Sequence, residues 1–238
     1  MNCKDCQLNN EFWTDVKSDE TKQRLLLKLF YSHQIDFSCL DASLKLCSLN
    51  NEEAIKLIFE LLEKISINEI LELVKEDFTP FNIEAKDIPQ FSNFDDCYYN
   101  VISALIDSGV DKATYEKMGY FLRNNPRKLG ADKKYGENHA KTAAMMGLCN
   151  AGKNIGISPT PMGVIFNSLS KETKENIKPK LCLYIPFIQN YFAQDMDFEK
   201  LYQSISILSE STQKRRMSNI NHLICIITNS IDHELYGH

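Results

Sequence analysis

Residues 133–163, KKYGENHAKTAAMMGLCNAGKNIGISPTPMG, contain the local signals that decide the predicted fold. Small and apolar residues recur there at three- and four-residue spacing, which predicts a short helix with a closely packed buried face. These residues are Ala140, Ala143, Ala144, Gly147 and Leu148. The turn-forming residues 150–154 then separate two short apolar runs and predict a hairpin. Thr160 and Pro161 are typical of a helix start, as N-cap and first helical residue.

The order helix, hairpin, helix predicts a winged helix, in which residues 135–148 read a DNA groove and the hairpin is the wing. Asn138, His139 and Lys141 are the candidates for contact with base edges, because amide and ammonium groups match the acceptors and donors of the major groove. His139 has an alternative interpretation as a histidine near the helix start that is bonded to the backbone.

Charge is unevenly distributed along the chain, which carries −5 overall. Residues 111–181 hold 13 Lys and Arg against 6 Asp and Glu, whereas residues 1–110 hold 10 against 20. A basic middle beside an acidic half favours a local polyanion-binding surface, although a solvated basic face without a partner is the alternative. The predicted phosphate contacts are Arg127, Lys128, Lys133, Lys134, Lys141, Lys153, Arg215 and Arg216.

A polar cluster opens the last long predicted helix, residues 213–231. Ser211 or Thr212 is placed to cap this helix. The residues of its first turns are Lys214, Arg215, Arg216 and Asn219. Because the amides and dipole of a helix N-terminus favour an anion, this cluster predicts a phosphate contact in a second helix-turn-helix-like module.

Four short motifs are spaced along residues 118–163: MGYF at 118–121, KYGENHAK at 134–141, MGL at 146–148 and PTPMG at 159–163. They resemble winged-helix domains associated with type II restriction endonucleases and related defence proteins. Residues 211–216, STQKRR, are similar to the second helix-turn-helix that follows in those proteins, so the resemblance covers about residues 97–230. The resemblance implies binding of duplex DNA, with any nuclease domain in a separate segment.

These observations predict a mainly α protein with three parts. Residues 1–95 form a helical domain of unknown role, which matches nothing in the resembled family. Residues 96–180 form a winged-helix domain with a small β-hairpin wing, and residues 181–238 form the second helix-turn-helix-like module. The proline-containing residues 79–94 are the clearest linker.

The predicted function is binding of double-stranded DNA, as the recognition part of a restriction or defence system. No cofactor and no metal site are expected for this function. The acidic N-terminal half is a candidate surface for a nuclease or another protein subunit. An interaction scaffold, whose winged helices pack on protein rather than on DNA, is an alternative.

A second alternative is a type II restriction endonuclease or one of its subunits. Asp77, Glu84 and Lys86 loosely match the Asp…Glu-x-Lys arrangement, in which two carboxylates hold Mg²⁺ and the lysine polarises the scissile phosphate. In such enzymes the Glu-x-Lys lies on a strand of a mixed sheet. Here it lies in a proline-flanked segment among predicted helices. No Ser/His/Asp constellation, phosphate-cradling glycine loop or HExxH pair predicts other chemistry.

The location expected from the sequence is cytoplasmic. No apolar run approaches the roughly 18 residues that span a bilayer, and the N-terminus lacks the features of a signal peptide. The 8 cysteines lie mostly within apolar helical patterns and are expected to be reduced. Cys3 and Cys6 form a CxxC without the further ligands of a zinc site, which favours a loose terminus over a metal site.

Overall fold

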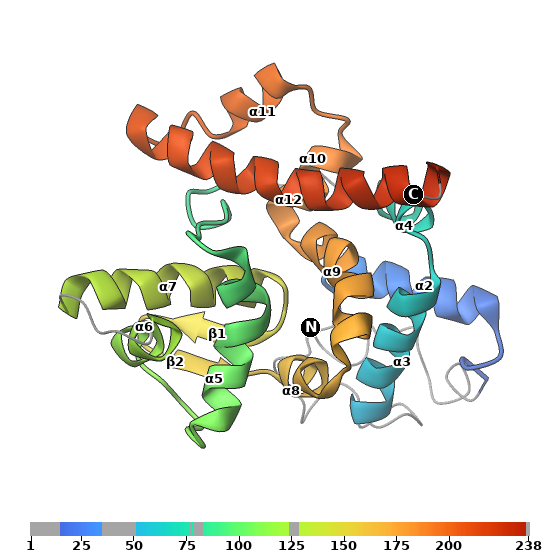
Figure 1. Ribbon diagram of the computed structural model, residues 1–238. Helices are drawn as coiled ribbons and strands as arrows, with labels where there is room; N and C mark the ends of the chain where they lie inside the picture. Colours follow the sequence, from blue (N-terminus) through green and yellow to red (C-terminus); the bar gives the residue numbers. More distant parts are fainter. Residues whose placement is uncertain (1–14, 35–50, 77, 79–82, 124–128, 237–238) are drawn as a thin grey trace.

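A computed structural model describes residues 15–34, 51–76, 78, 83–123 and 129–236 of the protein. In these residues the chain is mainly helical and contains a two-stranded antiparallel sheet (Figure 1), which confirms the mainly α prediction and the small hairpin. No helix in the described ranges is both long enough and apolar enough to cross a membrane.

The first helices are α2 (Glu20–Tyr31), α3 (Asn51–Lys64) and α4 (Ile67–Glu76). The middle elements are the π-helical turn η2 (Asp96–Asn100), α5 (Val101–Asp107), α6 (Tyr115–Arg123), α7 (Leu129–Met145), β1 (Cys149–Gly152), β2 (Gly156–Pro159) and α8 (Pro161–Ser168). The last helices are α9 (Lys171–Tyr184), α10 (Pro186–Ala193), α11 (Phe198–Ser204) and α12 (Glu210–Tyr236).

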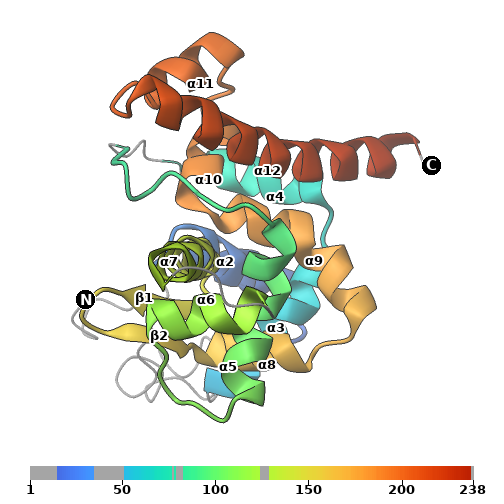
Figure 2. The same ribbon diagram turned by 60° about the vertical axis from the view of Figure 1, so that its left-hand side comes forward.

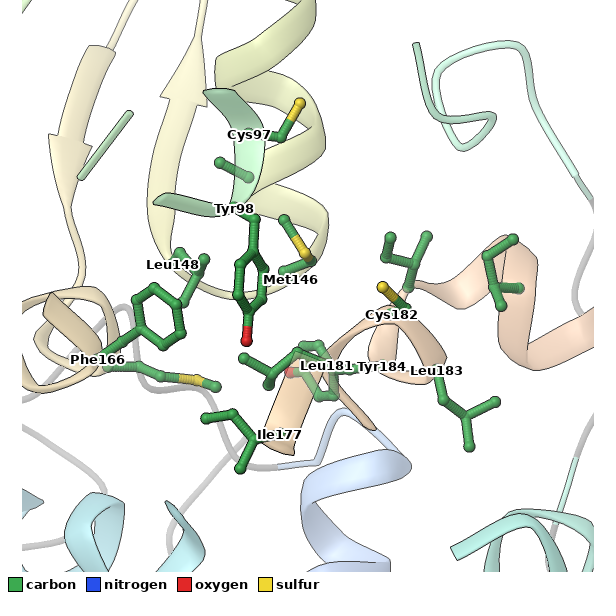
Figure 3. Close-up of a cluster of buried hydrophobic side chains, with 14 of the residues drawn as sticks. Cys97, Tyr98, Met146, Leu148, Phe166, Ile177, Leu181, Cys182, Leu183 and Tyr184 are labelled. Carbon is green, nitrogen blue, oxygen red and sulfur yellow. The ribbon is translucent and has the colours of Figure 1, made fainter. Parts of the chain in front are cut away.

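Helix α9 connects the early and late parts of the chain, because it packs against α3 and α4 as well as α10 and α12. Its residues Ile177 and Leu181 are fully buried and lie near Tyr98 and Phe166 in one apolar cluster (Figure 3). The Tyr98 ring meets the Phe166 ring edge to face at 5.0 Å, and its hydroxyl donates to the Lys174 carbonyl at 2.6 Å. Because its hydroxyl is hydrogen-bonded, this large buried side chain has no unsatisfied donor.

The predicted boundary between residues 180 and 181 falls inside α9. The lysine-rich residues 171–180 are helical because Ser170 caps the first turn and Ile177 anchors the helix in the core. Buried side chains from all three predicted parts belong to one hydrophobic cluster. The packing therefore has no break at this boundary.

Two glycines bring α6 and α7 into close backbone contact. A Cβ atom at Gly119 would lie 1.9 Å from the Asp132 carbonyl oxygen, and one at Gly136 would lie 2.0 Å from the Tyr115 carbonyl oxygen. Real Cβ atoms essentially never approach so closely, so only glycine fits at both positions. The crossing fixes the orientation of α7, which carries all three predicted base contacts.

Helix α7 begins and ends earlier than the predicted 135–148. Gly147 adopts a positive φ of 76°, and the Leu148 amide donates to the Ala143 carbonyl at 3.1 Å. This is the hydrogen-bond pattern of a Schellman C-cap, which stops the helix before the hairpin. Leu148 was expected on the helical stripe, but it lies beyond the helix and is buried.

The predicted hairpin and the following helix form, but the turn is at residues 153–155, so residues 150–152 lie in β1 rather than at the tip. Strands β1 and β2 pair with Cys149 opposite Pro159 and with Gly152 opposite Gly156. Ala113, which precedes α6, exchanges two hydrogen bonds of 2.8 Å with Ile157 of β2. The Thr160 hydroxyl accepts from the Gly163 amide at 3.0 Å and caps α8 at Pro161, as expected from the sequence.

Candidate functional site

A hollow of about 200 Å³ lies between α7, the segment 85–90 and the first turns of α12. We call it the α7–α12 hollow. Figures 1 and 2 show the chain after residue 83 passing between α7 and α12 before it enters η2. The charged and polar residues that line the hollow are Lys86, Gln90, Lys134, Glu137, Asn138, Lys141, Thr142 and Arg216. Cations distant in sequence thus line one hollow, and Glu137 is the acidic residue of its lining.

Lys134 and Lys141 of α7 lie on either side of Glu137. Their Nζ atoms are 3.1 and 2.6 Å from its carboxylate oxygens. The hydrogen bond from Lys141, followed by that from Lys134, holds the pKa of Glu137 below its usual value. Exposed pairs of this kind contribute at most about 1 kcal/mol to stability. Their main effect here is to position the two ammonium groups. One carboxylate leaves the pair of lysines with a net positive charge.

Arg216 projects from α12 into the same hollow. Its guanidinium donates to the Ile88 carbonyl, while its Nε is buried without a hydrogen-bond partner. Burial, with a smaller contribution from Arg215, lowers the pKa of Arg216 to about 10. The group therefore stays charged at neutral pH. A buried donor without an acceptor is unfavourable, so the Arg216 guanidinium has hydrogen-bonding capacity that the described residues do not use.

The segment 85–90 is held to α7 by a pair of hydrogen bonds. The Thr142 hydroxyl accepts from the Gln90 amide at 3.3 Å and donates to the Gln90 carbonyl at 3.1 Å. The sequence predicts this segment as part of a linker and does not identify Gln90 and Thr142 as contact residues. Neither residue follows a local pattern, because their importance comes from contact between distant parts of the chain.

The structure corrects the prediction that His139 contacts a base edge. His139 is 1% exposed, donates from Nδ1 to the Tyr135 carbonyl at 2.7 Å, and accepts at Nε2 from the Ser92 and Asn93 amides at 3.3 and 3.4 Å. Burial lowers its pKa, which favours the neutral ring that this bonding requires. Backbone bonding, the alternative interpretation, describes this side chain, and it is not accessible to a base edge.

The other predicted residues have different surroundings. Asn138 is half-buried in the hollow, whereas Asn219 lines a separate one. Lys153 is exposed at the tip of the hairpin, on the side of α7 away from α12 (Figure 2). Three further predicted phosphate contacts are exposed outside the hollow: Lys133, Lys214 and Arg215. Lys214 forms an ion pair of 3.0 Å with Glu210. Arg127 and Lys128 lie outside the described residues.

Helix α12 starts earlier than predicted, at Glu210. The Gln213 amide donates to the Ser209 carbonyl at 2.8 Å, which places the start of the helical bonding at Ser209. The predicted caps, Ser211 and Thr212, therefore lie inside the helix. Lys214, Arg215 and Arg216 accordingly lie beyond the first turn, so their contact with an anion depends on their side chains.

The residues of the nuclease alternative do not form the expected arrangement. Glu84 and Lys86 are exposed and form an ion pair of 2.8 Å next to a turn, where a strand was required. Asp77, Cys3 and Cys6 lie outside the described residues. Across the described part of the chain, no three His, Cys, Asp or Glu side chains form a group that could hold a metal ion. Lys86 instead lines the α7–α12 hollow.

Comparison of the chain with protein-family models, with curated proteins and with solved structures found no match.

Proposed function

We propose that this protein binds double-stranded DNA and holds its sugar-phosphate backbone at the α7–α12 hollow. The observation that carries the proposal is that Lys134, Lys141 and Arg216 line the same hollow. The Nε of Arg216 has no acceptor. Phosphate oxygens supply strong acceptors and the opposite charge, and they are the main determinant of affinity in protein–DNA complexes.

The order of elements in residues 96–159 supports a winged helix as the DNA-binding unit. Helix α5 is followed by the bridge residue Ala113, then by α6, α7 and the β1–β2 hairpin, and Ala113 pairs with Ile157 of β2. In this proposal α7 is the reader helix, with Asn138 at a base edge. Lys153 at the hairpin tip contacts a phosphate on the other side of α7.

The helix pair α11 and α12 is proposed as the second DNA-binding module. Arg215 and Arg216 of α12 would contact phosphates, and Lys214 would contact the same sugar-phosphate backbone of the DNA. The resemblance to restriction-associated domains extends the proposal to the recognition part of a restriction or defence system. In that setting the acidic N-terminal half is the surface for a nuclease subunit.

Binding of a labelled mixed-sequence duplex over a salt series tests the proposal. Each cation that neutralises a phosphate adds about −0.9 to the slope of log affinity against log salt. Affinity should therefore fall steeply between about 50 and 200 mM salt. Lys141→Ala should weaken binding and reduce the size of the slope by about 1.

Lys56→Ala is the matched control for Lys141→Ala. Lys56 is also an exposed helical lysine, paired with a glutamate four residues earlier at 2.5 Å, but it lies on α3. Affinity independent of salt, no binding to any duplex, or equal losses in the two variants would reject the proposal. Adding Mg²⁺ to the same reactions tests the endonuclease alternative, which expects discrete fragments that Glu84→Ala abolishes.

A further inference from the structure

A second hollow, of about 300 Å³, lies beside the first between residues 91–95 and the next turns of α12. We call it the aromatic hollow. Phe91 and Phe94 line it from the segment that leads into η2, and Ser218, Asn219 and His222 line it from α12. The phosphate-binding role proposed for Lys134, Lys141 and Arg216 does not use these residues.

Three aromatic rings form one wall of this hollow. The Phe91 and Phe94 ring centroids are 5.3 Å apart, and the His222 ring meets them edge to face at 5.9 and 5.7 Å. Phe94 is buried and stacks on Tyr98 at 5.9 Å, which ties the wall to the core. Phe91 is partly buried and His222 is exposed, so each residue is at least partly open to solvent. An accessible ring held in place is a surface on which a planar group stacks.

Amide and hydroxyl groups stand next to the aromatic wall. Ser218 and Asn219 are adjacent on α12, and Asn93 lies across from them in the segment 91–95. The Asn93 side-chain oxygen accepts from the Asp95 amide at 3.2 Å, which leaves its amino group to donate. Carboxamides both donate and accept, and this combination matches the edges of nucleobases.

A cation is placed to hold the phosphate of the same nucleotide. Arg215, Ser218, Asn219 and His222 follow the three- and four-residue spacing that puts side chains on one face of a helix. Arg215 is exposed, and its guanidinium is 3.5 Å from the Thr212 hydroxyl. About 10 Å of helix separates Arg215 from His222, and the guanidinium lies toward Thr212, on the other side of Arg215 from the hollow. The long arginine side chain must therefore turn toward the hollow for both to serve one nucleotide.

We propose that the aromatic hollow receives one unstacked nucleobase of a DNA strand whose phosphate lies on Arg215. This inference rests on the proposed DNA binding and adds the class of DNA that is preferred. A paired base must be unstacked and unpaired before it can enter, whereas an extrahelical base requires little of that work. The protein therefore prefers duplexes that contain an unpaired nucleotide.

The test compares two labelled duplexes that differ by one extra unpaired adenine in one strand. Stacking of a base on an aromatic side chain corresponds to about five- to 150-fold in affinity, so the duplex with the extra adenine should bind at least about fivefold more tightly. Phe91→Ala and His222→Ala should each reduce this preference and leave affinity for the fully paired duplex unchanged. Phe198→Ala, which removes an exposed aromatic ring of α11, is the control.

The outcomes separate the two proposals. Equal affinity of the unchanged protein for both duplexes overturns the aromatic hollow as a base site and leaves duplex binding intact. Equal loss of affinity for both duplexes in Phe91→Ala and His222→Ala also overturns it, because that result indicates a structural role. Failure to bind either duplex rejects the proposed function and the base site together.

Discussion

Replacing Gly136 by alanine tests whether the backbone contact between α6 and α7 holds the middle of the protein together. The new Cβ atom would lie 2.0 Å from the Tyr115 carbonyl oxygen and 2.6 Å from the Gly119 amide nitrogen. Both neighbours are backbone atoms of the α6 region and cannot turn away as a side chain would. The two helices must therefore separate by more than about 1 Å to restore an ordinary contact.

Gly130, on the first turn of α7, is the matched site. A Cβ atom there meets nothing within 4 Å. Alanine favours a helix over glycine by about 1 kcal/mol, so Gly130→Ala should stabilise the protein by up to that amount. Gly136→Ala gains the same helical preference but also incurs the overpacking penalty, typically about 1–3 kcal/mol and here at its upper end or beyond. Its net effect is a loss of about 2 kcal/mol.

Thermal unfolding followed by circular dichroism measures both changes. At about 2–4 °C per kcal/mol for a chain of this size, Gly136→Ala should lower the melting temperature by about 4–8 °C. Gly130→Ala should raise it by about 2–4 °C. Equal shifts of the two variants in the same direction would refute the close approach of α6 and α7, because helix propensity alone would then account for both.

Two further predictions concern buried titratable groups. Burial lowers the folded-state pKa of His139, so below about pH 6.5 the unfolded chain binds more protons than the folded protein, and stability should fall there as the pH is lowered. His139→Gln should therefore show a smaller loss of melting temperature on acidification. An identical pH dependence of the variant and the unchanged protein would contradict this. Burial raises the pKa of the Cys149 and Cys182 thiols, whereas Cys225 is exposed. Among these three, iodoacetamide should label Cys225 first in the native protein by mass spectrometry, with equal labelling after denaturation as the control.

Local interactions explain the parts of the fold that the sequence predicts well. The hairpin follows from a cluster of turn-forming residues, and the start of α8 follows from the hydroxyl of Thr160 and the fixed φ of Pro161. Each of these signals acts within a few residues, so neighbouring positions are sufficient to detect it. The end of α7 at Met145, before the positive φ of Gly147, has an equally local cause, although the predicted boundary lay three residues too late.

The sequence by itself determined the helical class, the hairpin, the cap of α8 and the basic character of residues 111–181. Tertiary structure alone decided that His139 is bonded to the Ser92 and Asn93 amides and that Arg216 meets the lysines of α7. Helical periodicity shows which residues share a face of one helix. Which faces become buried, and which cations meet, depends on packing between segments far apart in the chain.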